Sequence, residues 1–190
     1  MADKFLQEFN ATFSTGSHVW RASEDFLVQL RKVADDTPQT IFDSCERTSV
    51  ARSSLYKSVS PYCNLIIGPQ TIVDKSIEGV IETIRVPITI EAIFKINERD
   101  SDGALTDVQG WIAWLQERIE QYLQPKDDGF PNGMVKTVPW VWNWSSGALD
   151  KSQIGRTVRR IADAGSPVTG SVYALDLTYD IDVWPTHPLT

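Results

Sequence analysis

The sequence predicts an α+β fold, in which long antiparallel strands form one sheet and helices pack on one face of it. Residues 84–96 and 171–184 alternate apolar and polar side chains over lengths beyond the usual strand. Between them, residues 106–123 carry an apolar stripe at helical spacing. The predicted element order is α-β-β-α-β-β. A chain of 190 residues fits one domain, here residues 23–184, with an irregular arm at 1–22 and a tail at 185–190.

The first helix is predicted over residues 23–36. Ser23 is the expected N-cap, two acids follow it in the first turn, and Thr37-Pro38 should end the helix. Its apolar positions at helical spacing are Phe26, Leu27, Leu30, Val33 and Ala34. A short apolar strand is expected over residues 62–68, after a polar stretch without a firm period.

The strand at 84–96 has one apolar face, and its Pro87 lies on the other face. Proline lacks an N–H, so Pro87 predicts an edge or a bulge at that point. In the helix that follows, Thr106 and Gln109 form a T-x-x-Q capping box, and Pro125 ends it. The segment 154–170 fits either a helix or a strand hairpinned to the last one, and its short turn favours the strand.

The bulk composition bounds the class of protein. The formal net charge is −7 and the isoelectric point about 4.8, which disfavours general binding to nucleic acid or anionic membranes. Cys45 and Cys63 are expected as buried thiols in a reducing compartment. No run of 18 apolar residues occurs, so a soluble protein without a membrane span is expected.

A row of tryptophans on alternate residues, Trp140, Trp142 and Trp144, allows two interpretations. The row could be a platform on which a sugar or nucleobase stacks, which would make the protein a carbohydrate-binding module. It could equally be the inner face of a strand. Burying a tryptophan contributes on the order of 5 kcal/mol as an upper bound, so the core or a subunit interface is preferred.

The acidic segment from Glu98 to Gln109 spaces its carboxylates like a calcium-binding loop, but it departs from that pattern at both ends. A glutamate stands at the first position, and an amide replaces the bidentate carboxylate at the last. The preferred interpretation is a solvated turn between strand and helix, in which Asp107 favours the helix N-terminus.

Catalysis has little support in the sequence. His18 lies in the arm and His187 in the tail, and no common phosphate-binding, nucleophile or metal motif occurs. We therefore expect a protein that is not an enzyme and that holds no cofactor or metal.

Two clusters of opposite charge are candidates for an interface between subunits. The basic cluster consists of Lys151, Arg156, Arg159 and Arg160, and the acidic one consists of Asp176, Asp180 and Asp182 on the polar face of the last strand. A solvated surface, or phosphate binding by the basic cluster, are the alternatives.

The order of elements resembles the tail-terminator and tail-completion proteins of tailed bacteriophages. The resemblance rests on SEDFLVQLRKVADD, NLIIGP, VPITIEAIFKIN, TDVQGWIAWLQERIEQYL and YALDLTYDIDV, and it covers residues 23–184. It does not extend to FPNGMVKTVPWVWNW, the basic cluster or the N-terminal arm.

The resemblance implies a subunit that assembles with copies of itself into a ring, often a hexamer. Such a ring caps the finished tail tube and joins it to the head-connector proteins, and DNA slides through it without sequence-specific binding. The implied location is the virion neck, with the host cytoplasm as the place of assembly.

Overall fold

The computed structural model describes most of the chain. The described residues are 17–48, 61–97, 99, 102, 104, 106–126, 129–136, 142–145, 155–163 and 171–185, and within 155–163 Val158 alone has a described side chain. The helices are α2 (His18–Leu30) and α3 (Val108–Leu123). The strands are β1 (Ser44–Thr48), β2 (Tyr62–Ile67), β3 (Thr71–Lys75), β4 (Ile81–Ile96), β5 (Trp142–Trp144), β6 (Gly155–Asp163) and β7 (Ser171–Val183).

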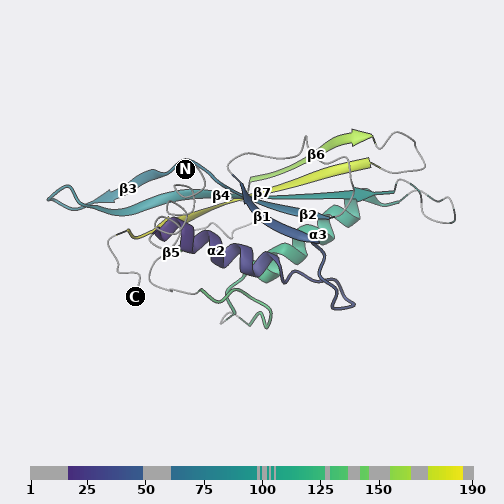
Figure 1. Ribbon diagram of the computed structural model, residues 1–190, viewed down its shortest axis with the longest axis horizontal. Helices are drawn as coiled ribbons and strands as arrows, with labels where there is room; N and C mark the ends of the chain where they lie inside the picture. Colours follow the sequence, from purple (N-terminus) through teal and green to yellow (C-terminus); the bar gives the residue numbers. More distant parts are fainter. Residues whose placement is uncertain are drawn as a thin grey trace, which may run out of the picture.

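The described strands form one sheet, built around the long antiparallel pair of β4 and β7 (Figure 1). β2 and β3 both pair with β4, and β6 and β5 both pair with β7. β1 lies outside β2 and runs parallel to it, so the sheet is mixed rather than wholly antiparallel. The α+β fold and its two long strands are confirmed, and the strand interpretation of residues 154–170 is confirmed for the described residues 155–163. β1 and β3 are additional to the predicted order, and three strands follow α3 where that order has two.

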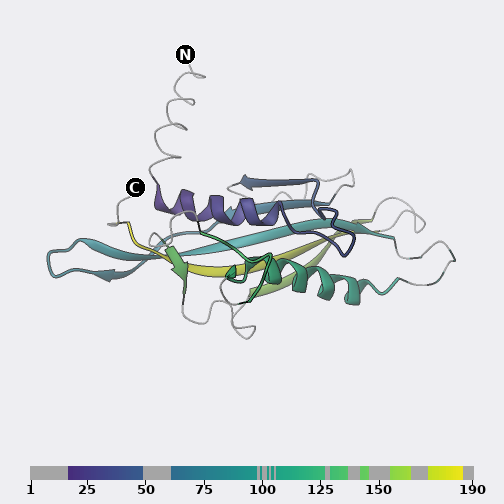
Figure 2. The same ribbon diagram turned by 90° about the horizontal axis from the view of Figure 1, so that it is seen from below.

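Both helices lie on the same face of the sheet (Figure 2). The apolar sides of β4 and β7 meet them there and form the main core with Phe26 and Leu30 of α2 and Ile112 and Leu115 of α3. The predicted alternation is confirmed, since Val86, Ile88, Ile90 and Ala92 are all fully buried. The domain therefore has two layers, helices on sheet.

The first helix begins six residues before the expected start at residue 24. Its N-cap is Ser17, whose hydroxyl accepts a hydrogen bond of 3.3 Å from the backbone N–H of Trp20. Ser23, the expected cap, lies inside the helix, where its hydroxyl donates to the Trp20 carbonyl at 2.7 Å. Residues 18–22 are therefore helical rather than irregular, and 1–16 lie outside the described residues. The helix ends at Leu30, well before Pro38.

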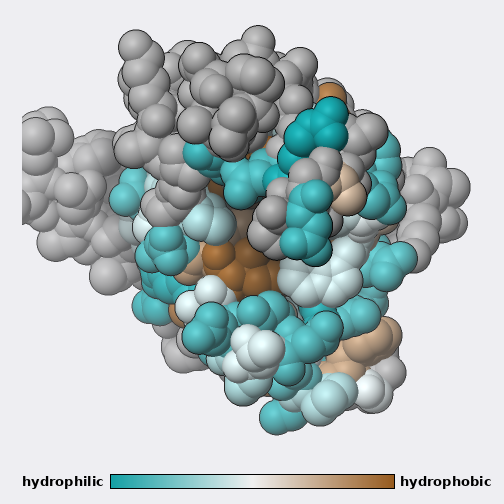
Figure 3. Space-filling model, turned by 90° about the vertical axis from the view of Figure 1, so that its right-hand side faces the viewer, coloured by the Kyte–Doolittle hydropathy of each residue, from teal (hydrophilic) through white to brown (hydrophobic). Residues whose placement is uncertain are grey.

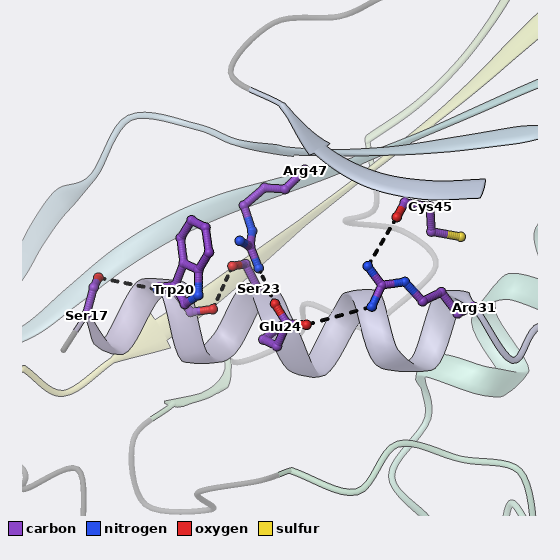
Figure 4. A network of polar contacts seen from close by, with 7 residues as sticks. All are labelled: Ser17, Trp20, Ser23, Glu24, Arg31, Cys45 and Arg47. Carbon is purple, nitrogen blue, oxygen red and sulfur yellow. Dashed lines mark hydrogen bonds and ion pairs between the residues drawn. The ribbon is translucent and has the colours of Figure 1, made fainter. Parts of the chain in front are cut away.

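Contacts between α2 and β1 hold this edge strand against the domain (Figure 4). The Arg47 guanidinium lies 3.5 Å from the centre of the Trp20 ring and forms an ion pair of 2.6 Å with Glu24. Arg31 pairs with the same carboxylate at 3.8 Å and donates to the Cys45 carbonyl at 3.4 Å. The polar sequence around β1 has no strand periodicity, so side-chain contacts to α2 explain its placement.

The second helix starts one residue later than the capping box predicts. Asp107 is the N-cap, and its carboxylate accepts a hydrogen bond of 2.9 Å from the Gly110 N–H. The prediction of a capping box formed by Thr106 and Gln109 was wrong. A carboxylate at the N-cap satisfies an N–H and interacts favourably with the helix dipole, which explains why Asp107 prevails. The buried stripe follows the prediction: Ile112, Leu115, Ile119, Tyr122 and Leu123.

Pro87 lies within the central strand, at the point where the neighbour on one side changes. β3 pairs with β4 up to Arg85, and β2 pairs with it from Ile88. Pro87 therefore needs no N–H toward either strand. Its carbonyl accepts a hydrogen bond of 2.8 Å from Gly68, which leads from β2 to β3. Pro87 thus marks the point where β4 changes from one neighbouring strand to another. This differs from the predicted edge or bulge, because β4 is a central strand that pairs with β7 on its other side.

Candidate assembly surface

A two-stranded hairpin projects from the body of the domain at one end (Figure 1). It consists of residues 71–85, and we call it the hairpin arm. The turn between its strands is closed by a hydrogen bond of 2.8 Å from the Ser76 N–H to the Val80 carbonyl. The Ser76 hydroxyl accepts from the Val80 N–H at 3.1 Å, and Gly79 adopts a φ of 81° that favours glycine.

The hairpin arm exposes apolar side chains among its charged ones. All five residues of β3 are exposed, and the exposed large apolar side chains of the arm have fractional exposures from 37% at Ile81 to 108% at Ile77, at the turn. Among the described residues, the exposed large hydrophobic side chains of the arm are Ile72, Val73, Ile77, Val80 and Ile81; Val28 and Val135 are those elsewhere. The exposed apolar side chains are therefore concentrated on one projecting element.

Such an arm has a strong physical reason to bind a partner. Full burial of a Val or Ile side chain contributes about 1.5–3 kcal/mol, and these side chains leave much of that unrealised. A two-stranded hairpin standing in water is marginally stable by itself. Within the described residues β3 pairs with β4 alone, and its register shifts after Ile72 and again after Asp74. An exposed apolar edge of this kind marks a surface for association.

The hairpin arm was missed in the sequence. Residues 69–83 lack a single apolar face, because exposed strands on both sides of a hairpin need no alternation. One signal was present: two apolar pairs, Ile72-Val73 and Val80-Ile81, flank a mainly polar segment that ends in Gly79, which is the pattern of a hairpin turn.

The tryptophan row belongs to the core as far as the structure describes it. Trp142 is fully buried, and Trp144 packs edge-on against Phe26 and Tyr179 at ring-centre distances of 5.1 and 5.7 Å. Trp140 lies outside the described residues. A sugar ring cannot stack on a side chain that the protein already covers, so Trp142 cannot serve as part of a glycan platform.

The acidic cluster lies on the sheet face away from the helices, but it is not uniformly free for a partner. Asp182 accepts two hydrogen bonds from Arg85, at 2.9 and 3.2 Å, and a third from the Ser145 hydroxyl at 3.0 Å. The carboxylate of Asp182 raises the pKa of Arg85 further above its usual value. Asp176 is partly buried, and Asp180 is exposed. Asp180 is thus the most accessible of the three.

The basic cluster is on the strand next to the acidic one. Lys151 lies outside the described residues, and for Arg156, Arg159 and Arg160 the structure describes the backbone of β6 alone. β6 pairs with β7 in the same chain, with Thr157 opposite Asp176. The backbone of Arg156, Arg159 and Arg160 therefore lies on the strand next to the one that carries the acidic cluster, within the same subunit. A contact between the two clusters across subunits stays a prediction.

The other candidate residues are distributed without forming a site. Glu98 and Asp100 lie outside the described residues, and so does His187; His18 is the first residue of α2. Cys45 and Cys63 are both buried free thiols, directly opposite each other on β1 and β2. Among the described residues, no cluster of three or more His, Cys, Asp or Glu side chains is arranged to hold a metal ion.

The fold and the projecting arm define an α+β domain with an exposed apolar hairpin. Comparison with models of known protein families gives no match, and comparison with curated proteins finds no relative. Neither described helix is both long and apolar enough to cross a membrane.

Proposed function

We propose that this protein is a structural subunit of a tailed-bacteriophage virion. Copies assemble into a ring that caps the tail tube and offers the surface to which the head-connector proteins join. The hairpin arm carries the proposal: five exposed apolar side chains on one projecting hairpin are typical of a surface for association.

A ring needs contacts between unlike surfaces, because a closed cyclic assembly repeats one heterologous contact. An arm at one end of an elongated domain supplies one such surface. The α+β element order, with its long paired strands and helices on one face, is in keeping with the resemblance to tail terminators. Neither a cofactor nor a catalytic group takes part in this role.

The outer sheet face suits a channel through which DNA passes without being held. It carries Asp176 and Asp180 beside the ion pair of Arg85 and Asp182. A face with excess carboxylates repels the phosphate backbone and so avoids tight binding. The protein then belongs to the neck of the virion and is assembled in the host cytoplasm.

Deleting the gene from the genome of the phage that encodes it tests the function. We expect DNA-filled heads beside unjoined tails, many of them of abnormal length, in electron micrographs of the lysate. A plasmid copy of the wild-type gene should restore joined virions. Normal joined virions from the deletion would refute the assignment as a tail cap.

A further inference from the structure

The end of the molecule opposite the hairpin arm has an apolar hollow. Figure 3 looks straight at this end and shows a hydrophobic area in a depression, with polar residues around it. In Figure 1 the arm points away from this end, which is where β4 ends and where α3 and β7 begin. A projecting apolar element and an apolar depression thus lie at opposite ends of one chain.

The elements at this end carry partly buried aromatic side chains. Trp111 and Trp114 of α3 and Tyr173 of β7 are packed against the core and are only partly buried. Phe94 links them, since its ring lies 4.5 Å from Trp111 and 6.1 Å from Tyr173 between ring centres. The rings of Trp111 and Trp114 are 6.0 Å apart. The Arg118 guanidinium lies 5.6 Å from the centre of the Trp114 ring. Partly exposed aromatic side chains are typical anchors of protein interfaces.

We call the end that carries Trp111, Trp114 and Tyr173 the aromatic end. We infer that the hairpin arm of one copy docks onto the aromatic end of the next copy, so that the chains assemble head to tail. The contact places Ile77 and its neighbours on the arm against Trp111 and Trp114. The contact is heterologous, because the arm and the aromatic end are different surfaces. Repeating such a contact closes a ring when the rotation that relates neighbouring copies is a full turn divided by a whole number. In this docking the partner of the arm is a second copy of the same chain. Only the location of the assembly in the virion rests on the proposed function.

A second copy is a better occupant than an unrelated protein, because both apolar surfaces belong to the same chain. One head-to-tail contact removes the arm and the aromatic end from water in every copy. An unrelated partner on the arm would leave the aromatic end of each subunit exposed. Burying apolar surface on both sides is what drives association.

Disulfide trapping tests the contact directly. Two single variants, Ile77→Cys and Trp114→Cys, are purified separately, checked for an unchanged melting curve, mixed and oxidised with copper phenanthroline. We expect a covalent dimer in the mixture and little in either variant alone. Val135→Cys replaces Trp114→Cys in the control, because Val135 is 66% exposed and lies outside both surfaces. Dimers from Ile77→Cys alone would indicate an arm-to-arm contact and refute the docking, as would equal trapping with Val135→Cys.

A charge placed on the arm provides a second test that does not depend on Trp114. Ile77 is fully exposed, so Ile77→Asp leaves the fold intact. We expect at least a tenfold weaker self-association by sedimentation velocity, whereas Val135→Asp behaves as the wild type. Undiminished assembly of Ile77→Asp overturns the docking while leaving the function open. If the docking tests succeed but the gene deletion still gives normal virions, the docking stands and only the proposed function is overturned. Loss of head-connector binding without loss of self-association would assign the arm to that other partner and refute the docking.

Discussion

The indole N–H of Trp142 donates a hydrogen bond of 2.9 Å to the carboxylate of Asp25, joining the short strand β5 to α2 across the core. Both residues are buried, with Asp25 4% exposed. The Phe26 ring lies 5.4 Å from Trp142, so the same contact region is also packed. A strand of three residues has few backbone hydrogen bonds, and this side chain anchors it to the helical layer.

Replacement of Trp142 by alanine should destabilise the protein severely. The change creates a cavity and removes a donor from a buried carboxylate, and truncation of a buried tryptophan costs about 3–5 kcal/mol. Urea unfolding measures the difference in the free energy of unfolding. Val135→Ala serves as the control, because its exposed side chain should change stability by less than about 0.5 kcal/mol. A loss of under 1 kcal/mol at Trp142 would contradict its place in the core.

Alanine substitutions at Asp107 and Thr106 should show which of the two residues caps α3. Asp107→Ala should cost about 1 kcal/mol, because the Gly110 N–H loses its acceptor at the positive end of the helix dipole. Thr106→Ala should cost much less. Thermal unfolding of the two variants checks this order, and the opposite order would restore the capping box that the sequence predicts.

Gly68 leaves no room for a side chain where the chain passes Pro87. A Cβ atom at residue 68 would lie 2.7 Å from Cγ of Pro87, so Gly68→Ala should destabilise the protein by about 1–3 kcal/mol. Pro87→Ala removes that Cγ atom, and the double variant should recover part of the loss. A double-mutant cycle in urea measures the coupling, and strict additivity of the two changes would show that the two residues do not clash.

The paired thiols should differ in reactivity. A hydrogen bond from the Cys63 thiol, aided by the positive charge of Arg31, lowers the pKa of Cys45, and the same bond together with burial raises the pKa of Cys63. The thiolate therefore forms first at Cys45 as the pH rises, and the thiolate is the reactive species. Iodoacetamide labelling of the folded protein between pH 7 and 9, followed by peptide mapping, should modify Cys45 first. Preferential modification of Cys63 would contradict the arrangement, and equal rates after unfolding are the control.

The long elements were predictable because burial of one face imposes a period on the sequence. Ile88, Ile90 and Ala92 alternate with polar residues on β4, and Leu175, Leu177 and Tyr179 do so on β7, so strand type and facing follow directly. The helix ends were less predictable. Ser17 and Ser23 are both competent caps, and tertiary packing of Val19 and Ala22 decides in favour of the earlier start.

The candidate site was mostly invisible in the sequence. The hairpin arm has no buried face and hence no periodicity. The strand β1 is held by contacts of Arg47 and Cys45 with residues of α2, which are distant from them in the sequence. The pairing of β6 with β7, which carry the two charged clusters, was predictable from the short turn between them. Sequence patterns report burial well, whereas exposed binding surfaces leave weaker signals.

Native mass spectrometry of the purified wild-type protein, with negative-stain images of the same sample, tests the central claim most directly. If the protein is a ring-forming cap, a single oligomeric mass that is a whole multiple of the 21.3 kDa chain should dominate at micromolar concentration, and the images should show closed rings. A monomer at every concentration, or a symmetric dimer that does not grow further, would contradict the account.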